Sequence, residues 1–82
     1  MVAIVTKTEG KERVMKLSAR NQLKGRIVEI VKGATTSHVR IDVNGAVITS
    51  AITNESVADL QLEVGKTAYA VIKASSVMVG VD

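Results

Sequence analysis

The sequence predicts an all-β fold of five short strands, with one short helix between the third and fourth strands. Three observations predict this class. β-branched residues dominate, since the 82 residues include 14 Val, 7 Ile and 7 Thr but only 4 Leu, and branched side chains fit a pleated strand better than a helix. Short runs of alternating apolar and polar residues recur between turn signals. Finally, an Asn-Gly dipeptide joins two such runs, which is the strongest short-range hairpin signal.

Residues 22–32 predict a long first strand. Apolar and polar residues alternate from Leu23 to Ile27, but the phase of the alternation slips at Val28. A slip in a period-2 pattern indicates a β-bulge or a strong bend, and Gly25 makes a bend easier. We therefore expect this strand to curve, as strands do at the corner of a barrel.

Residues 38–43 and 46–53 predict a β-hairpin around Asn44-Gly45. A two-residue turn of this type needs positive φ at both of its residues, which Asn and Gly accept. The turn also sets the register, since it pairs Ile41 with Ile48 on a mostly apolar face. Turn chemistry and side-chain pattern therefore agree.

The rest of the chain completes the element order. Residues 54–60 predict a short helix that Thr53 or Asn54 caps. A strand at 67–73, a turn and a last strand at 77–81 come after it. Three strands, a helix and two strands are typical of a small Greek-key barrel of the OB type, which is five-stranded.

Residues 1–14 differ from the rest of the chain, because a short apolar stretch is succeeded by a polar, turn-like one around Gly10. We interpret them as an N-terminal extension, either a tail or an extra edge strand. Residues 15–82 then form the single domain. A domain this small buries only about 60% of the surface that its unfolded chain exposes. The chain has no cysteine for disulfides, and His38 alone is too little for a structural zinc site. Oligomerisation is the support that remains.

Composition argues against several function classes. The formal net charge is only +3 and Tyr69 is the one aromatic residue, whereas binders of single-stranded nucleic acid stack bases on aromatic side chains over a basic groove. No apolar run approaches the ~18 residues of a membrane span, and no secretory signal is visible, so the default compartment is the cytoplasm. No serine, histidine and aspartate stand in a catalytic pattern, and we expect no enzyme activity.

Three polar clusters stand at strand ends, at 18–21, 53–56 and 73–76. Hydrogen-bond donors dominate in them. An oxyanion has only acceptor oxygens, so a pocket for it needs many donors and a compensating positive charge. The clusters therefore suit a small oxyanion, although solvated turns and helix caps have the same composition, and both interpretations stay open at this point.

A family resemblance favours the first interpretation. The segments SARNQLKG at 18–25, EIVKG at 29–33, the AIT-x-x-S pattern at 51–56, L-x-V-G at 62–65 and VIKAS at 71–75 resemble the molbindins, the small molybdate-binding Mop proteins, in the same order. The resemblance covers residues 15–82. Only residues 1–14 depart from the pattern of a single such domain.

The resemblance implies an oxyanion-binding protein for storage or homeostasis, with molybdate or tungstate as the ligand and with neither an organic cofactor nor a metal cation. It implies OB barrels that pair by exchanging strands and assemble as a homohexamer, a trimer of dimers, with pockets at subunit interfaces. Alternatives are a sensing or accessory module of a regulator or of a transporter ATPase. The residues that it implies for the main site are Ser18, Ala19, Arg20, Asn21, Thr53, Ser56, Lys73, Ala74 and Ser75. A second site on the threefold axes would use the turn around Val31, Lys32 and Gly33.

Overall fold

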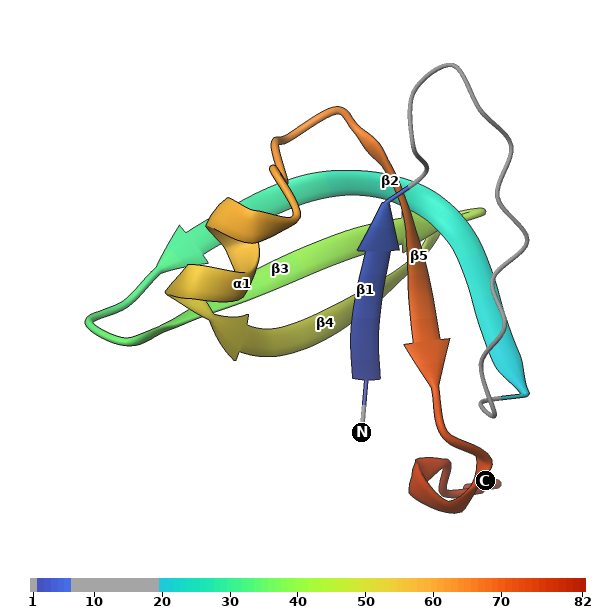
Figure 1. The fold of residues 1–82 in the computed structure, drawn as a ribbon. Coiled ribbons are helices and arrows are strands. Elements are labelled where there is room, and N and C mark those ends of the chain that lie inside the picture. The colour runs from blue at the N-terminus through green and yellow to red at the C-terminus, as the bar shows by residue number, and fades with distance from the viewer. Residues whose placement is uncertain (1, 7–19) are drawn as a thin grey trace.

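The structure, a computed structural model, describes residues 2–6 and 20–82. An antiparallel β-sheet and one short helix make up the fold (Figure 1). The elements in chain order are β1 (Val2–Thr6), β2 (Asn21–Lys32), β3 (Thr36–Val43), β4 (Ala46–Thr53), α1 (Asn54–Asp59), β5 (Thr67–Ile72) and the 3-10 turn η1 (Ala74–Ser76).

The sheet has five strands in the order β1-β5-β2-β3-β4, and every neighbouring pair is antiparallel. The long strand β2 arches over the molecule (Figure 1), so that its first half pairs with β5 and its second half with β3. The two outer strands of this order, β1 and β4, approach each other. Because β2 begins beside β5 and finishes beside β3, its two ends lie at opposite ends of the curved sheet.

Two local predictions are confirmed. The register between β2 and β3 shifts between Ile27 and Glu29, which makes Val28 the extra residue of a bulge at the point where the side-chain alternation slips. The hairpin has the predicted register, with Ile41 opposite Ile48. Its turn residues have positive φ, 50° at Asn44 and 93° at the glycine after it.

The predicted helix is also present, as α1. Of the two candidate caps, Thr53 is the one used: its side chain accepts a hydrogen bond from the backbone N–H of Ser56, with an N···O distance of 3.0 Å. This bond satisfies one of the N–H groups that have no partner within the first turn of a helix. The side chain of Asn54 instead bonds to the turn between β2 and β3.

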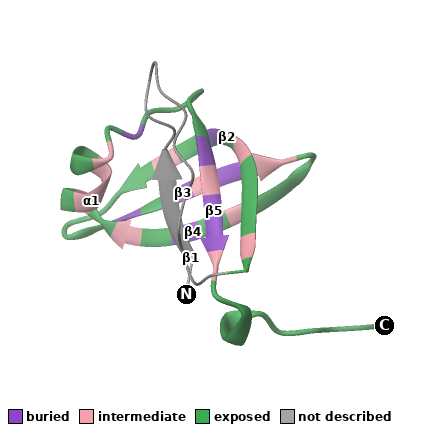
Figure 2. Cartoon of the chain, turned by 45° about the vertical axis from the view of Figure 1, so that its right-hand side comes forward, coloured by how far each residue is buried: buried purple, intermediate pink, exposed green. Residues whose placement is uncertain are grey.

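The prediction of a last strand at 77–81 is wrong. These residues form no strand, and they lead away from the sheet (Figure 2). Their alternating valines are typical of a strand, but a strand also needs an edge to pair with, and here β1 occupies the free edge of β5. Of the five strands expected in residues 15–82, four are therefore formed, and β1 is the fifth strand of the sheet.

The core lies inside the curve of the sheet and beneath α1 (Figure 2). Within residues 20–82 its buried apolar members are Ile27, Val39, Ile41, Leu62, Ala68, Ala70 and Val71. All but Leu62 come from β2, β3 and β5, the three inner strands of the sheet order. The helix adds partly buried side chains such as Val57. This core is small, and among residues 20–82 its fully buried apolar side chains are all aliphatic.

Candidate functional site

The first and third polar clusters come together at one end of the sheet. Asn21 opens β2 and pairs with Ile72, the last residue of β5. The Asn21 side-chain amide also donates a hydrogen bond to the Ile72 carbonyl oxygen, at 3.3 Å. Because the two strands are antiparallel, Arg20 just before β2 and Lys73 just after β5 stand at the same end of the sheet. Two segments about fifty residues apart in the sequence are thus adjacent in space.

The turn after β5 fixes the backbone of the third cluster. Lys73 precedes η1, and its carbonyl oxygen accepts a hydrogen bond from the Ser76 N–H at 2.8 Å. Lys73, Ala74 and Ser75 are all exposed. Among the described residues, no hydrogen bond or ion pair engages the side chains of Arg20, Lys73 or Ser75. One ammonium group, one guanidinium and one hydroxyl are therefore available for a ligand at this end.

The rest of the predicted main site lies elsewhere. Ser18 and Ala19 fall outside the described residues. Thr53 ends β4, where it pairs with Thr36 just beyond the far end of β2. There the Thr53 hydroxyl donates to the Ser56 hydroxyl at 2.8 Å. Within one chain the structure therefore joins Thr53 to Ser56 and separates both from Lys73.

The second predicted site also lies at the far end of β2. Val31 and Lys32 are the last residues of the strand, and both are exposed. Gly33 begins the turn to β3, and its N–H donates to the Thr36 carbonyl oxygen at 2.8 Å. The side-chain amide of Asn54 donates to the Gly33 carbonyl oxygen at 3.0 Å, so this turn is held against the start of α1.

Asn54 is a residue whose role sequence reasoning missed. Its backbone N–H donates to the Thr35 carbonyl oxygen, and its side-chain oxygen accepts a 2.6 Å hydrogen bond from the buried hydroxyl of Ser37. The AIT-x-x-S pattern leaves this position open, and the partners of Asn54 lie about twenty residues upstream. Its place at a helix start predicts a cap, and only the packing of α1 against the 33–35 turn reveals the longer-range bonds.

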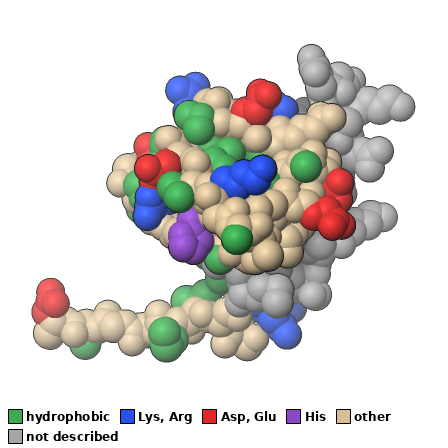
Figure 3. All heavy atoms as spheres, turned by 90° about the vertical axis from the view of Figure 1, so that its left-hand side faces the viewer, with side chains coloured by type: hydrophobic (Ala, Val, Ile, Leu, Met, Phe, Trp, Pro, Cys, Tyr) green, Lys and Arg blue, Asp and Glu red, His purple; other side chains and the backbone are tan. Residues whose placement is uncertain are grey.

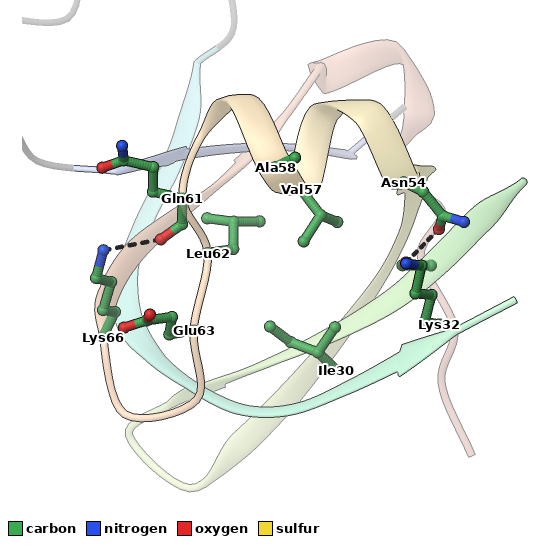
Figure 4. Close-up of a pocket in the computed structure, with 10 residues that line it drawn as sticks. Ile30, Lys32, Asn54, Val57, Ala58, Gln61, Leu62, Glu63 and Lys66 are labelled. Carbon is green, nitrogen blue, oxygen red and sulfur yellow. Dashed lines mark hydrogen bonds between the residues drawn. The ribbon is translucent and has the colours of Figure 1, made fainter.

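A cavity of about 490 Å³ lies between α1 and the far half of β2 (Figure 4). Its apolar floor includes Ile30, Val57 and Leu62, and the Glu63 carboxylate is on its wall. Neither Arg20 nor Lys73 lines it. Lys32 and Lys66 line the cavity as well, so it combines apolar side chains with charges of both signs, and its lining alone does not identify a ligand.

Metal ligands are not grouped in the described part of the chain. Residues 2–6 and 20–82 contain no cluster of three or more His, Cys, Asp or Glu side chains that could hold a metal ion. His38 is exposed on β3.

One face of the molecule carries charged side chains of both signs, scattered rather than gathered (Figure 3). In the same part of the chain, no helix has the length and apolar character to cross a membrane.

The pattern of the whole domain matches a known family. The family model described as TOBE domain matches residues 17–79. The chain belongs to this family. The resemblance to the Mop proteins is confirmed as well, since a protein of Haemophilus influenzae named probable molybdenum-pterin-binding protein is 55% identical over 69 residues, which are 83% of this chain and all of that protein.

Two solved structures extend the comparison. A crystal structure of ModG, described as a cytoplasmic molybdate-binding protein with molybdate bound, has a TM-score of 0.85 and 43% identity, covering 99% of this chain and 55% of ModG. This chain thus spans about half the length of ModG. MopII of Clostridium pasteurianum has a TM-score of 0.76 and 40% identity, covering 80% of this chain and all of MopII. Proteins of two lengths therefore share the fold.

Proposed function

We propose that this chain binds a small tetrahedral oxyanion, molybdate or tungstate, in the cytoplasm, that it stores or buffers the ion, and that it catalyses no reaction. The observation that carries the proposal is the meeting of Arg20-Asn21 with Lys73-Ala74-Ser75 at one sheet end. The names of its relatives, molybdenum-pterin-binding protein and molybdate-binding protein, support the choice of ligand.

The available groups suit the chemistry of a dianion. Molybdate offers four acceptor oxygens and no donor, so every partner must donate a hydrogen bond or carry positive charge. Lys73 supplies the charge, Ser75 a hydroxyl, and the backbone at Arg20 and Ala74 supplies N–H groups. Ser18 and Ala19 belong to the proposal through the SARNQ motif. Charge-assisted hydrogen bonds of this kind are about twice as strong as neutral ones.

A single chain does not enclose these donor groups. Lys73, Ala74 and Ser75 are exposed, and ion pairs in open water contribute only about 0 to 1 kcal/mol. A second copy can bring the Thr53–Ser56 pair, which lies at the other end of the sheet, against this cluster and exclude water from it. We therefore place the site between copies.

For the assembly we propose a homohexamer of three dimers, in which OB-type barrels pair by exchanging strands. The exposed apolar segment at 77–81 supports the exchange, because it has the pattern of a strand and lacks an edge to pair with. The turn at Val31, Lys32 and Gly33 remains our candidate for a second class of oxyanion site, on the threefold axes. Native mass spectrometry with and without molybdate measures oligomer size and bound ions together.

The test of the main site is the Lys73→Ala variant, titrated with molybdate in a calorimeter. We expect its Kd to rise at least about tenfold, equivalent to about 1.4 kcal/mol, while its circular dichroism spectrum stays that of the parent. Lys24→Ala is the matched control. Lys24 lies on β2 and is exposed, as Lys73 is, and its replacement changes the net charge by the same amount.

The Kd of the control should stay within a factor of about two of the parent, because Lys24 is not among the residues proposed for the site and salt screens its exposed charge. Sulfate, titrated into the parent, should bind more weakly, because the smaller ion leaves donors unfilled. Equal affinity of Lys73→Ala and the parent for molybdate would exclude Lys73 from the site.

A further inference from the structure

The edge of β5 has two candidate occupants within this one sequence. In the structure β1 holds the edge, pairing along its whole length from Val2 opposite Ile72 to Thr6 opposite Ala68. The other edge of β5 is taken by β2. Without β1, the N–H and C=O groups on one side of β5 would have no strand partner, and such an edge attracts another strand.

The C-terminal segment, residues 77–82, has the properties of a strand without a partner. Met78, Val79 and Val81 are 94%, 90% and 93% exposed. Within the described residues, nothing from 78 to 82 makes a hydrogen bond. The segment projects from the body of the molecule with apolar side chains along it (Figure 3). Such an apolar projection is costly in water unless another surface covers it.

The two segments are alike in sequence. Residues 1–5 read MVAIV and residues 78–82 read MVGVD. Aligned in this way, Val79 corresponds to Val2, Gly80 to Ala3 and Val81 to Ile4. If the C-terminal segment took the register of β1, Val79 would stand opposite Ile72 and Val81 opposite Ala70. The same alternation of residue types would then be presented to β5, as strand register requires.

The comparisons with known proteins indicate how much of this chain the relatives share. The match to MopII covers 80% of this chain and all of MopII, which is too little to include both β1 and the C-terminal segment, and the TOBE model begins at residue 17. The part of the chain that the TOBE model matches therefore does not include β1. The match to ModG covers 99% of this chain and so includes both segments.

From these observations we infer that β1 is an internal mimic of the C-terminal segment, and that the two compete for one position beside β5. When β1 leaves this position, the C-terminal segment of a second copy of the chain takes it. The inference rests on the proposed assembly through strand exchange, not on oxyanion binding. Its consequence is regulatory: β1 holds the chain unassembled, and its release exposes the edge through which copies join.

Disulfide trapping tests the competition, and the absence of cysteine from the sequence makes the readout clean. Directly opposite residues on antiparallel strands have Cα atoms about 4.5 to 5.5 Å apart, a separation that a disulfide spans. Ile72→Cys is combined with Val2→Cys in one variant and with Val79→Cys in another, and both are oxidised without molybdate. We expect the first to close within a chain and the second to form a covalent dimer on a non-reducing gel.

The register is tested by a third variant, Ile72→Cys with Gly80→Cys. Successive side chains of a strand point to opposite faces, so this variant should give at least about threefold less covalent dimer than the Val79→Cys variant. Equal yields would mean random collisions between tails. A disulfide closed within one chain between positions 72 and 79 would mean that the tail folds back on its own β5. Either result overturns the inference.

Competition itself is tested by weakening β1. Ala3→Pro with Ile4→Pro removes two backbone donors from the strand and should raise the covalent-dimer yield of the Ile72→Cys, Val79→Cys variant by about threefold or more. Should the double replacement unfold the sheet, Ala3→Pro alone is the milder version. An unchanged dimer yield in a folded variant would overturn the competition. Because no molybdate is present, this result is independent of the titration of Lys73→Ala.

Discussion

At the scale of the residue, Gly25 is needed because β2 and β3 come unusually close. A Cβ added at Gly25 would meet the backbone oxygen of Asp42, with the side chains of Ile41 and Val43 only 2.7 and 2.9 Å away. The sequence pattern alone assigns Gly25 to a bend. The geometry gives a second reason for glycine, since any larger residue would push β3 away, three positions before the bulge residue Val28.

We therefore predict that Gly25→Ala lowers the free energy of unfolding by about 1 to 3 kcal/mol, as overpacking of a tight site does. Urea denaturation at one fixed protein concentration measures this change. Gly80→Ala is the control, because nothing lies within 4 Å of a Cβ built there, and its effect should stay within about 0.5 kcal/mol. A Gly25→Ala variant as stable as the control would mean that β3 shifts freely to make room.

At the scale of the element, Asn54 joins α1 to the turn between β2 and β3. Its amide donates to the carbonyl oxygens of Gly33 and Ala34, and its oxygen accepts from Ser37, a residue only 1% exposed. One side chain thus fixes the start of the helix, the turn and a buried hydroxyl. Any oxyanion site formed by this turn depends on the same residue.

Asn54→Ala should destabilise the protein by about 1 to 3 kcal/mol, because it leaves the Ser37 hydroxyl buried without its acceptor. A double-mutant cycle with Ser37→Ala checks the cause by urea denaturation. When both partners are apolar, no polar group is left unsatisfied, so the double variant should lose at least about 0.5 kcal/mol less than the sum of the single losses. Simple additivity would show that the Ser37 bond contributes nothing.

The same scale shows what sequence patterns can and cannot predict. The bulge at Val28 and the hairpin register follow from alternation and turn chemistry, which act between neighbouring residues. The failed strand at 77–81 has the correct alternation, but a strand also depends on a free edge, and β1 holds that edge. Strand propensity cannot tell which of two similar segments takes it.

The candidate site, like the fold, could be predicted from the sequence only in part. The pairing of Asn21 with Ile72 could be anticipated only through the family resemblance, because no local signal links segments so far apart. The separation of Thr53 from Lys73 could not be anticipated at all, since it depends on the path of β2 from one end of the sheet to the other. Residue types therefore predicted the chemistry of the proposed site, and the register decided which of its parts lie together.

At the scale of the whole molecule, a small core stands beside several exposed apolar side chains from different elements. Leu23, Val47 and Val64 are 37%, 55% and 63% exposed, in addition to the C-terminal valines. A domain of this size has little stability to spare, and association is the means by which small domains cover such surfaces. The stability of this chain should therefore depend on its own concentration and on its ligand.

We predict that the Tm rises with protein concentration over a hundredfold range, because association favours the folded state by mass action. Molybdate at 100 times its Kd should add about 2.7 kcal/mol for each site, and each kcal/mol raises the Tm of a domain of this length by roughly 4 to 8 °C. Differential scanning calorimetry measures both effects, with sulfate at the same ionic strength as the control ion. A Tm that is independent of concentration would mean that the chain folds and remains a monomer. A Tm that rises equally with sulfate would mean that molybdate acts as a general salt, and would remove the thermodynamic basis for a selective cage between copies.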